Sequence, residues 1–101
     1  MVEYSVQLDN VFGSLADATR RDILQRVSQA ELSVGEIALP YQLTLAAISK
    51  HLKILEKARL VVKRRQGKHI YVRSSPYALA KAEDYLRQYA ELMDATPELV
   101  A

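Results

Sequence analysis

A dense run of positive charge in the second half of the chain constrains the fold more than any other feature. Nine basic residues and a single acidic one, Glu56, lie between Lys50 and Arg73. The remaining residues hold five of the 14 basic side chains and 11 of the 12 acidic ones, so the formal net charge of +2 conceals a strong separation of charge. A chain of 101 residues forms one domain with a modest core, and a basic segment of this kind is typical of a surface that faces a polyanion.

The first part of this segment, 44–57, has the apolar spacing of a helix. Ile48, Leu52 and Leu55 fall on one face, and Thr44 is a residue type that caps helix N-termini. A short helical pattern over 33–40 precedes it, and two helices joined by a turn favour a helix-turn-helix. The side chains of the second helix that are then expected to contact DNA are Thr44, Leu45, Ala46, Ser49, Lys50, Lys53 and Lys57.

Two β-prone runs with a glycine between them follow, which predicts a hairpin over 60–73. Residues 60–62 and 70–72 are rich in apolar and branched side chains, and 66–68 supply the turn. A cation near the tip of such a wing gains from the negative potential of DNA. The residues expected there are Arg64, Arg65, Lys68 and His69. The alternative is that these charges only keep the hairpin soluble and protect its edge.

Apolar helix patterns lie at both ends of the chain. The first covers 4–15, and the last starts with Pro76 and continues with a near-heptad spacing. Because the last helix is very apolar for so small a domain, we expect it to pack on a second copy, although packing within the chain alone also fits the pattern. The residues expected at this interface are Tyr4, Leu8, Val11, Phe12, Leu79, Ala82, Leu86, Tyr89 and Met93.

A further helix begins after Asp17, which is placed to cap it. Arg20 and Arg21 lie outside its apolar face, either as phosphate contacts or as solvated helix charges. Together the patterns predict one domain over 1–101 that is mainly α with a small β-hairpin. With about five helices and a two-stranded wing, this is a winged helix-turn-helix.

Several other classes of protein are not expected. The chain has no cysteine, which removes disulfides and thiolate metal sites, and it has no glycine-rich phosphate loop or paired-carboxylate pocket typical of an enzyme. No apolar run approaches the roughly 20 residues that span a bilayer, and 1–10 lack the features of a signal peptide. We therefore expect a cytoplasmic protein that is not an enzyme and needs no cofactor.

The chain resembles a winged-helix repressor of the ArsR family in the stretches VFGSLADATRRDILQRV, ELSVGEIA and LTLAAISKHLKILEKARLVVKRRQGKHIYVR, and in its final helix. The resemblance covers nearly the whole chain. It implies a homodimer, with the first and last helices at the interface, bound to an inverted-repeat operator on double-stranded DNA near its own promoter. The family's SKHL pattern falls on 49–52, which extends the DNA-contacting role to Ser49, Lys50 and His51.

The metal sites of that family are not matched. Its thiolate sensors use cysteines near the third helix, and other members place histidines on the last helix, where this chain has none. The two histidines, His51 and His69, both lie in the expected DNA-binding region without a second ligand in a plausible motif. The chain therefore resembles the metal-independent branch, whose members are plain repressors or respond to a partner protein or a small molecule.

These observations predict a sequence-specific transcriptional regulator that binds DNA as a homodimeric repressor through the helix 44–57 and the wing 60–73. The alternative is a winged-helix module whose basic face docks on an acidic partner protein. The two differ in whether the basic face prefers double-stranded DNA or an acidic protein.

Overall fold

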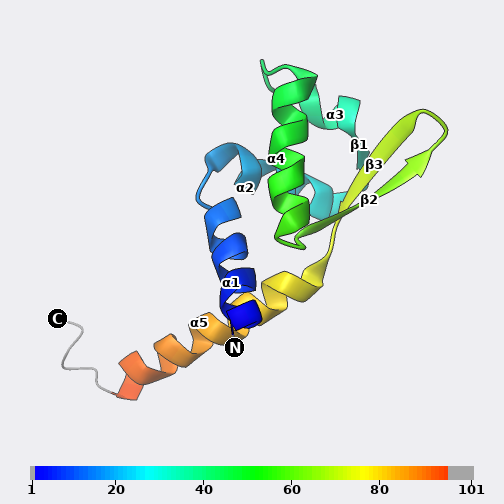
Figure 1. The fold of residues 1–101 in the computed structure, drawn as a ribbon. Coiled ribbons are helices and arrows are strands. Elements are labelled where there is room, and N and C mark those ends of the chain that lie inside the picture. The colour runs from blue at the N-terminus through cyan, green and yellow to red at the C-terminus, as the bar shows by residue number, and fades with distance from the viewer. Residues whose placement is uncertain (1, 96–101) are drawn as a thin grey trace.

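The computed structural model describes the backbone of residues 2–95 and the side chains of residues 7–94. Within this part the chain forms five helices and three strands, in the order α1 (Val2–Ser14), α2 (Ala18–Gln29), β1 (Leu32–Ser33), α3 (Val34–Ala38), α4 (Leu45–Lys57), β2 (Val61–Gln66), β3 (His69–Ser74) and α5 (Pro76–Ala95). The predicted mainly helical winged helix-turn-helix is confirmed (Figure 1). The predicted two-stranded wing is part of a larger sheet, because β1 pairs with β3.

Side chains cap the starts of three helices, two of which, at Asp17 and Thr44, the sequence predicts. Asp17 accepts a hydrogen bond from the backbone N–H of Arg20 at the start of α2, and Thr44 accepts one at the start of α4. Ser33 and Glu36 form a reciprocal capping box on α3. Each cap supplies a partner for a backbone N–H that the helix itself leaves unpaired, so the corners of the helix-turn-helix are fixed locally.

The sheet is antiparallel with the strand order β1-β3-β2, and β2 and β3 form the wing. Gln66 pairs with His69 across a two-residue turn, in which Gly67 has a φ of 62°, a conformation that glycine adopts without strain. The sequence does not predict β1, because two residues are too few to show an alternating pattern. This short strand ties the wing to the start of α3.

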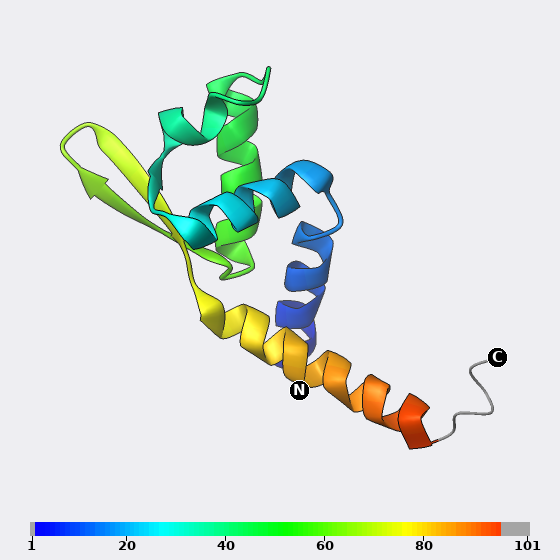
Figure 2. The same cartoon turned by 180° about the vertical axis from the view of Figure 1, so that it is seen from behind.

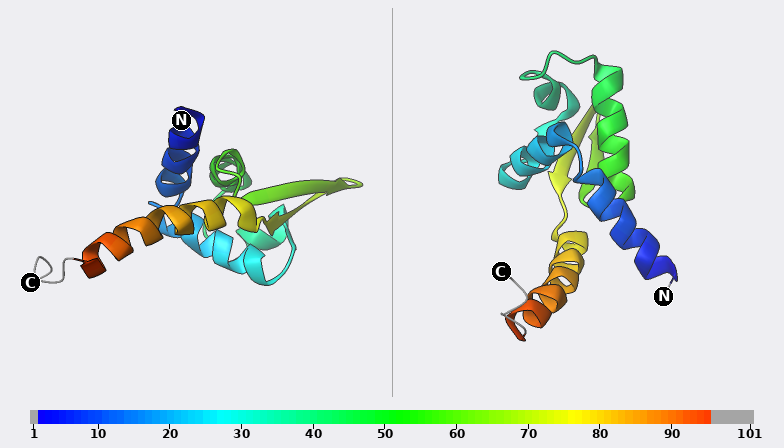
Figure 3. Two further views of the ribbon diagram at one scale, coloured as in Figure 1. Left: turned by 90° about the horizontal axis from the view of Figure 1, so that it is seen from below. Right: turned by 90° about the vertical axis from the view of Figure 1, so that its left-hand side faces the viewer.

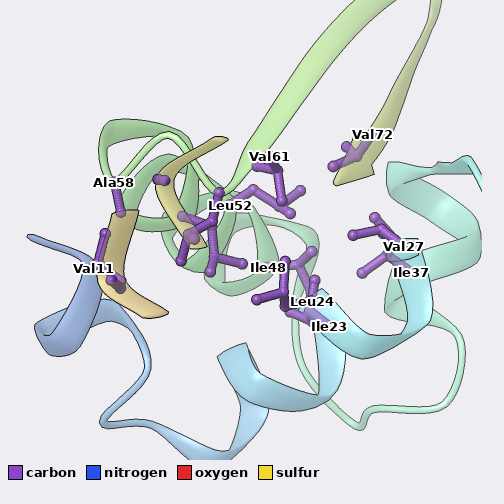
Figure 4. Close-up of a cluster of buried hydrophobic side chains, with 14 of the residues drawn as sticks. Val11, Ile23, Leu24, Val27, Ile37, Ile48, Leu52, Ala58, Val61 and Val72 are labelled. Carbon is purple, nitrogen blue, oxygen red and sulfur yellow. The ribbon is translucent and has the colours of Figure 1, made fainter. Parts of the chain in front are cut away.

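The helices and the sheet share one hydrophobic core (Figure 4). The face of α4 that carries Ile48, Leu52 and Leu55 is fully buried, as the helical spacing predicts. Val61 of β2 and Val72 of β3 belong to the same cluster, so the sheet closes the core from its side. Because a close-packed core permits few alternative arrangements, α4 is held in one orientation with its opposite face toward solvent.

The end of α4 is a Schellman motif without the usual glycine. The N–H of Leu60 donates to the carbonyl of Leu55 at 3.0 Å, and the N–H of Arg59 donates to that of Glu56 at 2.9 Å. Arg59 therefore occupies the left-handed position with a φ of 61°, where glycine is favoured because it has no Cβ. The buried side chains of Leu55 and Leu60 complete the motif, which directs the chain from α4 into the wing.

We expect Arg59→Gly to raise the free energy of unfolding by about 0.5–1 kcal/mol, because relief of the left-handed strain outweighs the extra chain entropy that glycine loses on folding. Arg59→Ala is the matched control, since it removes the same guanidinium group and keeps a Cβ. Urea unfolding of the three proteins gives the comparison. Equal stabilities for the glycine and alanine variants would show that the φ of Arg59 carries no strain.

The last helix, α5, starts against the body of the domain and then extends away from it (Figures 1 and 2). Ala78 and Ala82 on its first turns are buried in the core. Its far end and the wing project in opposite directions (Figure 3). The domain is consequently elongated, with principal extents of 55, 29 and 21 Å.

Candidate nucleic-acid interface

One face of α4 is basic and uncovered by the rest of the fold. Ser49, Lys50, Lys53 and Lys57 are exposed on it, with Ala46 one turn before Lys50. These positions recur every three or four residues, so they share the face opposite the buried stripe of α4. None of the three lysines forms an ion pair with an acidic side chain of residues 7–94. This basic face therefore presents positive charge that the described chain does not neutralise.

The N-terminal end of α4 carries the two other residues predicted from this helix. The hydroxyl of Thr44 accepts a hydrogen bond from the backbone N–H of Ala47 at 3.1 Å, so it serves as the helix cap. Leu45, the first residue of the helix, is 60% exposed although it is apolar. The N-terminal end of α4 thus exposes one polar residue, Thr44, and one apolar side chain, Leu45.

The tip of the wing carries exposed cations beside its turn. Arg65, Lys68 and His69 are exposed, as the sequence predicts. Neither Arg65 nor Lys68 has an ion-pair partner among the acidic side chains that the structure describes. Lys63, nearer the base of the wing, pairs with Glu56 at 3.2 Å. Arg65 and Lys68 therefore place unmatched positive charge at the tip of the wing.

Arg64 is bound within the protein. Its guanidinium group donates to both carboxylate oxygens of Glu31 at 2.7 to 3.0 Å, and to the side-chain oxygen of Gln66 at 2.7 Å. It also lies over the ring of Tyr71, its cross-strand neighbour, at 4.6 Å from the ring centre. The sequence predicts a phosphate contact for Arg64. In the structure its charge is paired with Glu31 at the surface, and this ion pair ties β2 to the segment before β1.

The Glu31–Arg64 contact should make the wing sensitive to acid. Hydrogen bonds from Arg64 hold the pKa of the Glu31 carboxyl below its ordinary value of 4.5. The unfolded chain then binds more protons than the folded chain, so the contact stabilises the fold above about pH 4.5 and is lost as the pH falls through the lower folded value. NMR titration should show a low pKa for Glu31 that returns toward 4.5 in Arg64→Gln.

Glu36 provides the internal control for that titration. Hydrogen bonds from Ser33 hold the pKa of Glu36 below its ordinary value, and Arg64 takes no part in them. The pKa of Glu36 should therefore be the same in both proteins. A pKa of Glu31 that does not move in Arg64→Gln would show that this arginine does not hold the carboxylate in solution.

His51 lies at the edge of the basic face and contacts the protein itself. Arg20 Nη1 is 3.2 Å from His51 Nδ1, and Arg20 Nε donates to the carbonyl of Ser14 at 2.7 Å. Asp17 forms an ion pair with Arg20 at 3.9 Å, and the side chain of Arg20 is only 15% exposed. Arg20 therefore joins the corner between α1 and α2 to α4. Its charge lies beside Asp17, although its side chain is mostly buried.

The local hydrogen bonds of this corner also affect Asp17. The backbone N–H of Arg20 donates to the Asp17 carboxylate at 3.0 Å and, with the nearby charge of the Arg20 guanidinium, lowers the pKa of Asp17. Arg20 and His51 are 31 residues apart in sequence. Because no periodic pattern links positions so distant, the sequence offers no signal for this contact.

The residues predicted at a dimer interface fall into two groups. Leu8, Val11 and Ala82 are at most 7% exposed and belong to the chain's own core, so they offer a partner little surface. The side chain of Tyr4 lies outside the described residues. The exposed group, at 37% to 60%, comprises Phe12 of α1 and Leu79, Leu86, Tyr89 and Met93 of α5. We refer to this second group as the apolar face of α1 and α5.

Other kinds of site are not found in the described part of the chain. Among its residues, no three or more His, Cys, Asp or Glu side chains are arranged to hold a metal ion. None of its helices is both long enough and apolar enough to cross a membrane. Every polar side-chain atom buried in this part has a hydrogen-bond partner.

Known proteins with a helix-turn-helix are similar to this chain. A family model described as a helix-turn-helix domain matches residues 15–64. The HTH-type transcriptional regulator Rv2034 of Mycobacterium tuberculosis is 36% identical over 95 residues, which cover 86% of this chain and 89% of that protein. A crystal structure of an ArsR family transcriptional regulator matches with a TM-score of 0.85 and 30% identity, over 89% of this chain and 93% of that chain.

A second solved structure adds an assembly state to the comparison. It is the homodimeric winged helix-turn-helix DNA-binding domain Mb0332 from Mycobacterium bovis, with a TM-score of 0.67 and 29% identity. The match covers 96% of this chain and 84% of that chain. With the fold, the basic face and these relatives in agreement, the chain belongs to the ArsR family of winged helix-turn-helix transcriptional regulators.

Proposed function

We propose that this regulator is a homodimeric repressor that binds an inverted-repeat operator, with α4 in the major groove and the wing along the DNA backbone. The main support is the basic face of α4, whose lysines lack acidic partners in residues 7–94. A major groove about 12 Å wide accepts one helix, and Ser49 and Lys50 can then donate hydrogen bonds to base edges. Lys53, Lys57 and the wing tip lie further along the basic surface and suit phosphates.

The apolar face of α1 and α5 supports a second copy as the partner. Leu86, Tyr89 and Met93 are 50% to 60% exposed on a helix whose far end extends beyond the body. Pairing through this end would leave the wings pointing away from the dimer axis, because α5 and the wing project in opposite directions (Figure 3). Two α4 helices would then contact half-sites about 10 bp apart, centre to centre. The homodimeric Mb0332 domain is consistent with this assembly.

The proposed repressor belongs to the metal-independent branch of its family. The chain contains no cysteine, and residues 76–95 contain no histidine. Carboxylates alone would bind a hard cation weakly, and Glu83 pairs with Arg87 at 3.1 Å. Release from DNA would then depend on a small molecule or a partner protein, or would not be regulated by a ligand.

Competition between two DNA fragments tests the proposed function. One is the region upstream of the protein's own gene, and the other is random DNA of equal length. At low salt we expect the upstream fragment to bind more tightly by at least about 10³-fold. Equal affinities would contradict an operator there. Tighter binding to a purified acidic protein than to either DNA would favour the alternative of a protein-docking module.

Removing the wing-tip cations should weaken binding to every DNA sequence. In Arg65→Ala with Lys68→Ala, the slope of log K against log salt should fall by about 0.9 for each phosphate that the protein no longer neutralises, because fewer counterions are released. Arg64→Ala is the matched control, since Glu31 already neutralises that side chain. If Arg64→Ala reduced the slope by as much per side chain removed as the double variant does, then Glu31 would not neutralise Arg64 in the complex with DNA.

A further inference from the structure

Leu45 is an apolar side chain that the fold buries only in part. The other large aliphatic side chains on the core side of α4, Ile48, Leu52 and Leu55, are at most 1% exposed. Leu45, at the first position of the same helix, is 60% exposed. It is therefore buried only in part, and a partner that covered it would gain the free energy of burying its apolar surface.

The neighbours of Leu45 indicate the chemistry of that partner. Helical spacing places Leu45 one turn before Ser49 and places Ala46 one turn before Lys50. A partner that covers Leu45 and extends over the basic face of α4 also meets Lys50 and Lys53, whose charges have no acidic partner in the described chain. An apolar protein groove would leave these charges unmatched, whereas the major groove of DNA matches them with phosphates.

One apolar group dominates the base edges of the major groove, the C5-methyl of thymine. We propose that Leu45 contacts this methyl group in each half-site of the operator, with Ala46 beside it. The contact presupposes the proposed function and adds a base preference to it. Leu45 gains by burial against the methyl and gains nothing comparable from cytosine, so the regulator should favour a T·A pair at this position.

Replacement of thymine by deoxyuridine tests the contact, because it removes only the C5-methyl and keeps the base pair. The probe is a duplex carrying the sequence that the wild-type protein enriches from random DNA, with each thymine replaced in turn. In wild type, one position per half-site should lose about fourfold in affinity when it carries uracil. In Leu45→Ala, thymine and uracil at that position should bind equally.

Ile54→Ala is the matched control, because Ile54 is an exposed aliphatic side chain near the other end of α4. This variant should keep the wild-type ratio between thymine and uracil. Thermal unfolding should show that both variants are folded. Two results would overturn the contact but not the proposed function. In the first, the protein enriches a defined site, yet uracil weakens wild-type binding at no position. In the second, Leu45→Ala keeps the wild-type ratio between the affinities for thymine and uracil. Failure to enrich any sequence overturns the proposed function together with the contact.

Discussion

Leu86→Lys should convert the proposed dimer into monomers and weaken binding to the proposed operator by at least about 10²-fold. Leu86 is 53% exposed in the single chain, so the substitution should leave the monomer folded. At the centre of the apolar face of α1 and α5, the ammonium group would lose its water without gaining an acidic partner. A monomer contacts one half-site, and it forgoes the gain in affinity that comes from two linked half-sites.

Gln88→Lys is the control for Leu86→Lys. Gln88 is exposed and lies two residues further along α5, so its side chain points to a different side of the helix. The same charge is therefore added outside the apolar face. Sedimentation analysis should show a monomer for Leu86→Lys and a dimer for Gln88→Lys. Dimers of wild-type affinity in both variants would place the subunit interface elsewhere.

Leu52→Ala should cost about 3 kcal/mol of the free energy of unfolding. Leu52 is 1% exposed at the centre of the core, where it fixes α4 against the other elements (Figure 4). Deleting a buried leucine removes its transfer free energy and leaves a cavity, and such substitutions cost about 2–5 kcal/mol. For a domain of this size, the melting temperature should fall by roughly 15 °C.

Ile54→Ala separates this core effect from a general effect on α4. Ile54 is 42% exposed two residues later on the same helix. Its truncation should cost less than about 1 kcal/mol, since much of the side chain already faces water. Calorimetry of both variants gives the comparison. Equal reductions in stability would mean that α4 is not anchored by its Ile48–Leu52–Leu55 face.

Patterns that repeat along the chain made much of this fold predictable. The spacing of Ile48, Leu52 and Leu55 identified both the buried side of α4 and, by exclusion, its basic face. The caps at Asp17 and Thr44 were predictable because a cap depends on residues only three positions away. The wing followed from two β-prone runs around a glycine.

Contacts between distant positions were not predictable in this way. Arg64 and Arg65 are predicted on opposite faces of the same strand, but only the tertiary position of Glu31 shows which of the two charges is matched. The contact of Arg20 with His51 likewise depends on how α2 packs against α4. A basic residue in the sequence therefore indicates a cation, but only the tertiary structure shows whether a carboxylate already neutralises it.

The most direct test of the proposed repressor is the set of sequences that the wild-type protein enriches from a pool of random double-stranded DNA. Two α4 helices related by two-fold symmetry should enrich an inverted repeat with half-sites about 10 bp apart, centre to centre. Leu86→Lys should not enrich that repeat. If wild type enriches no sequence, or a single half-site without its inverted copy, then this chain does not bind DNA as the symmetric dimer proposed.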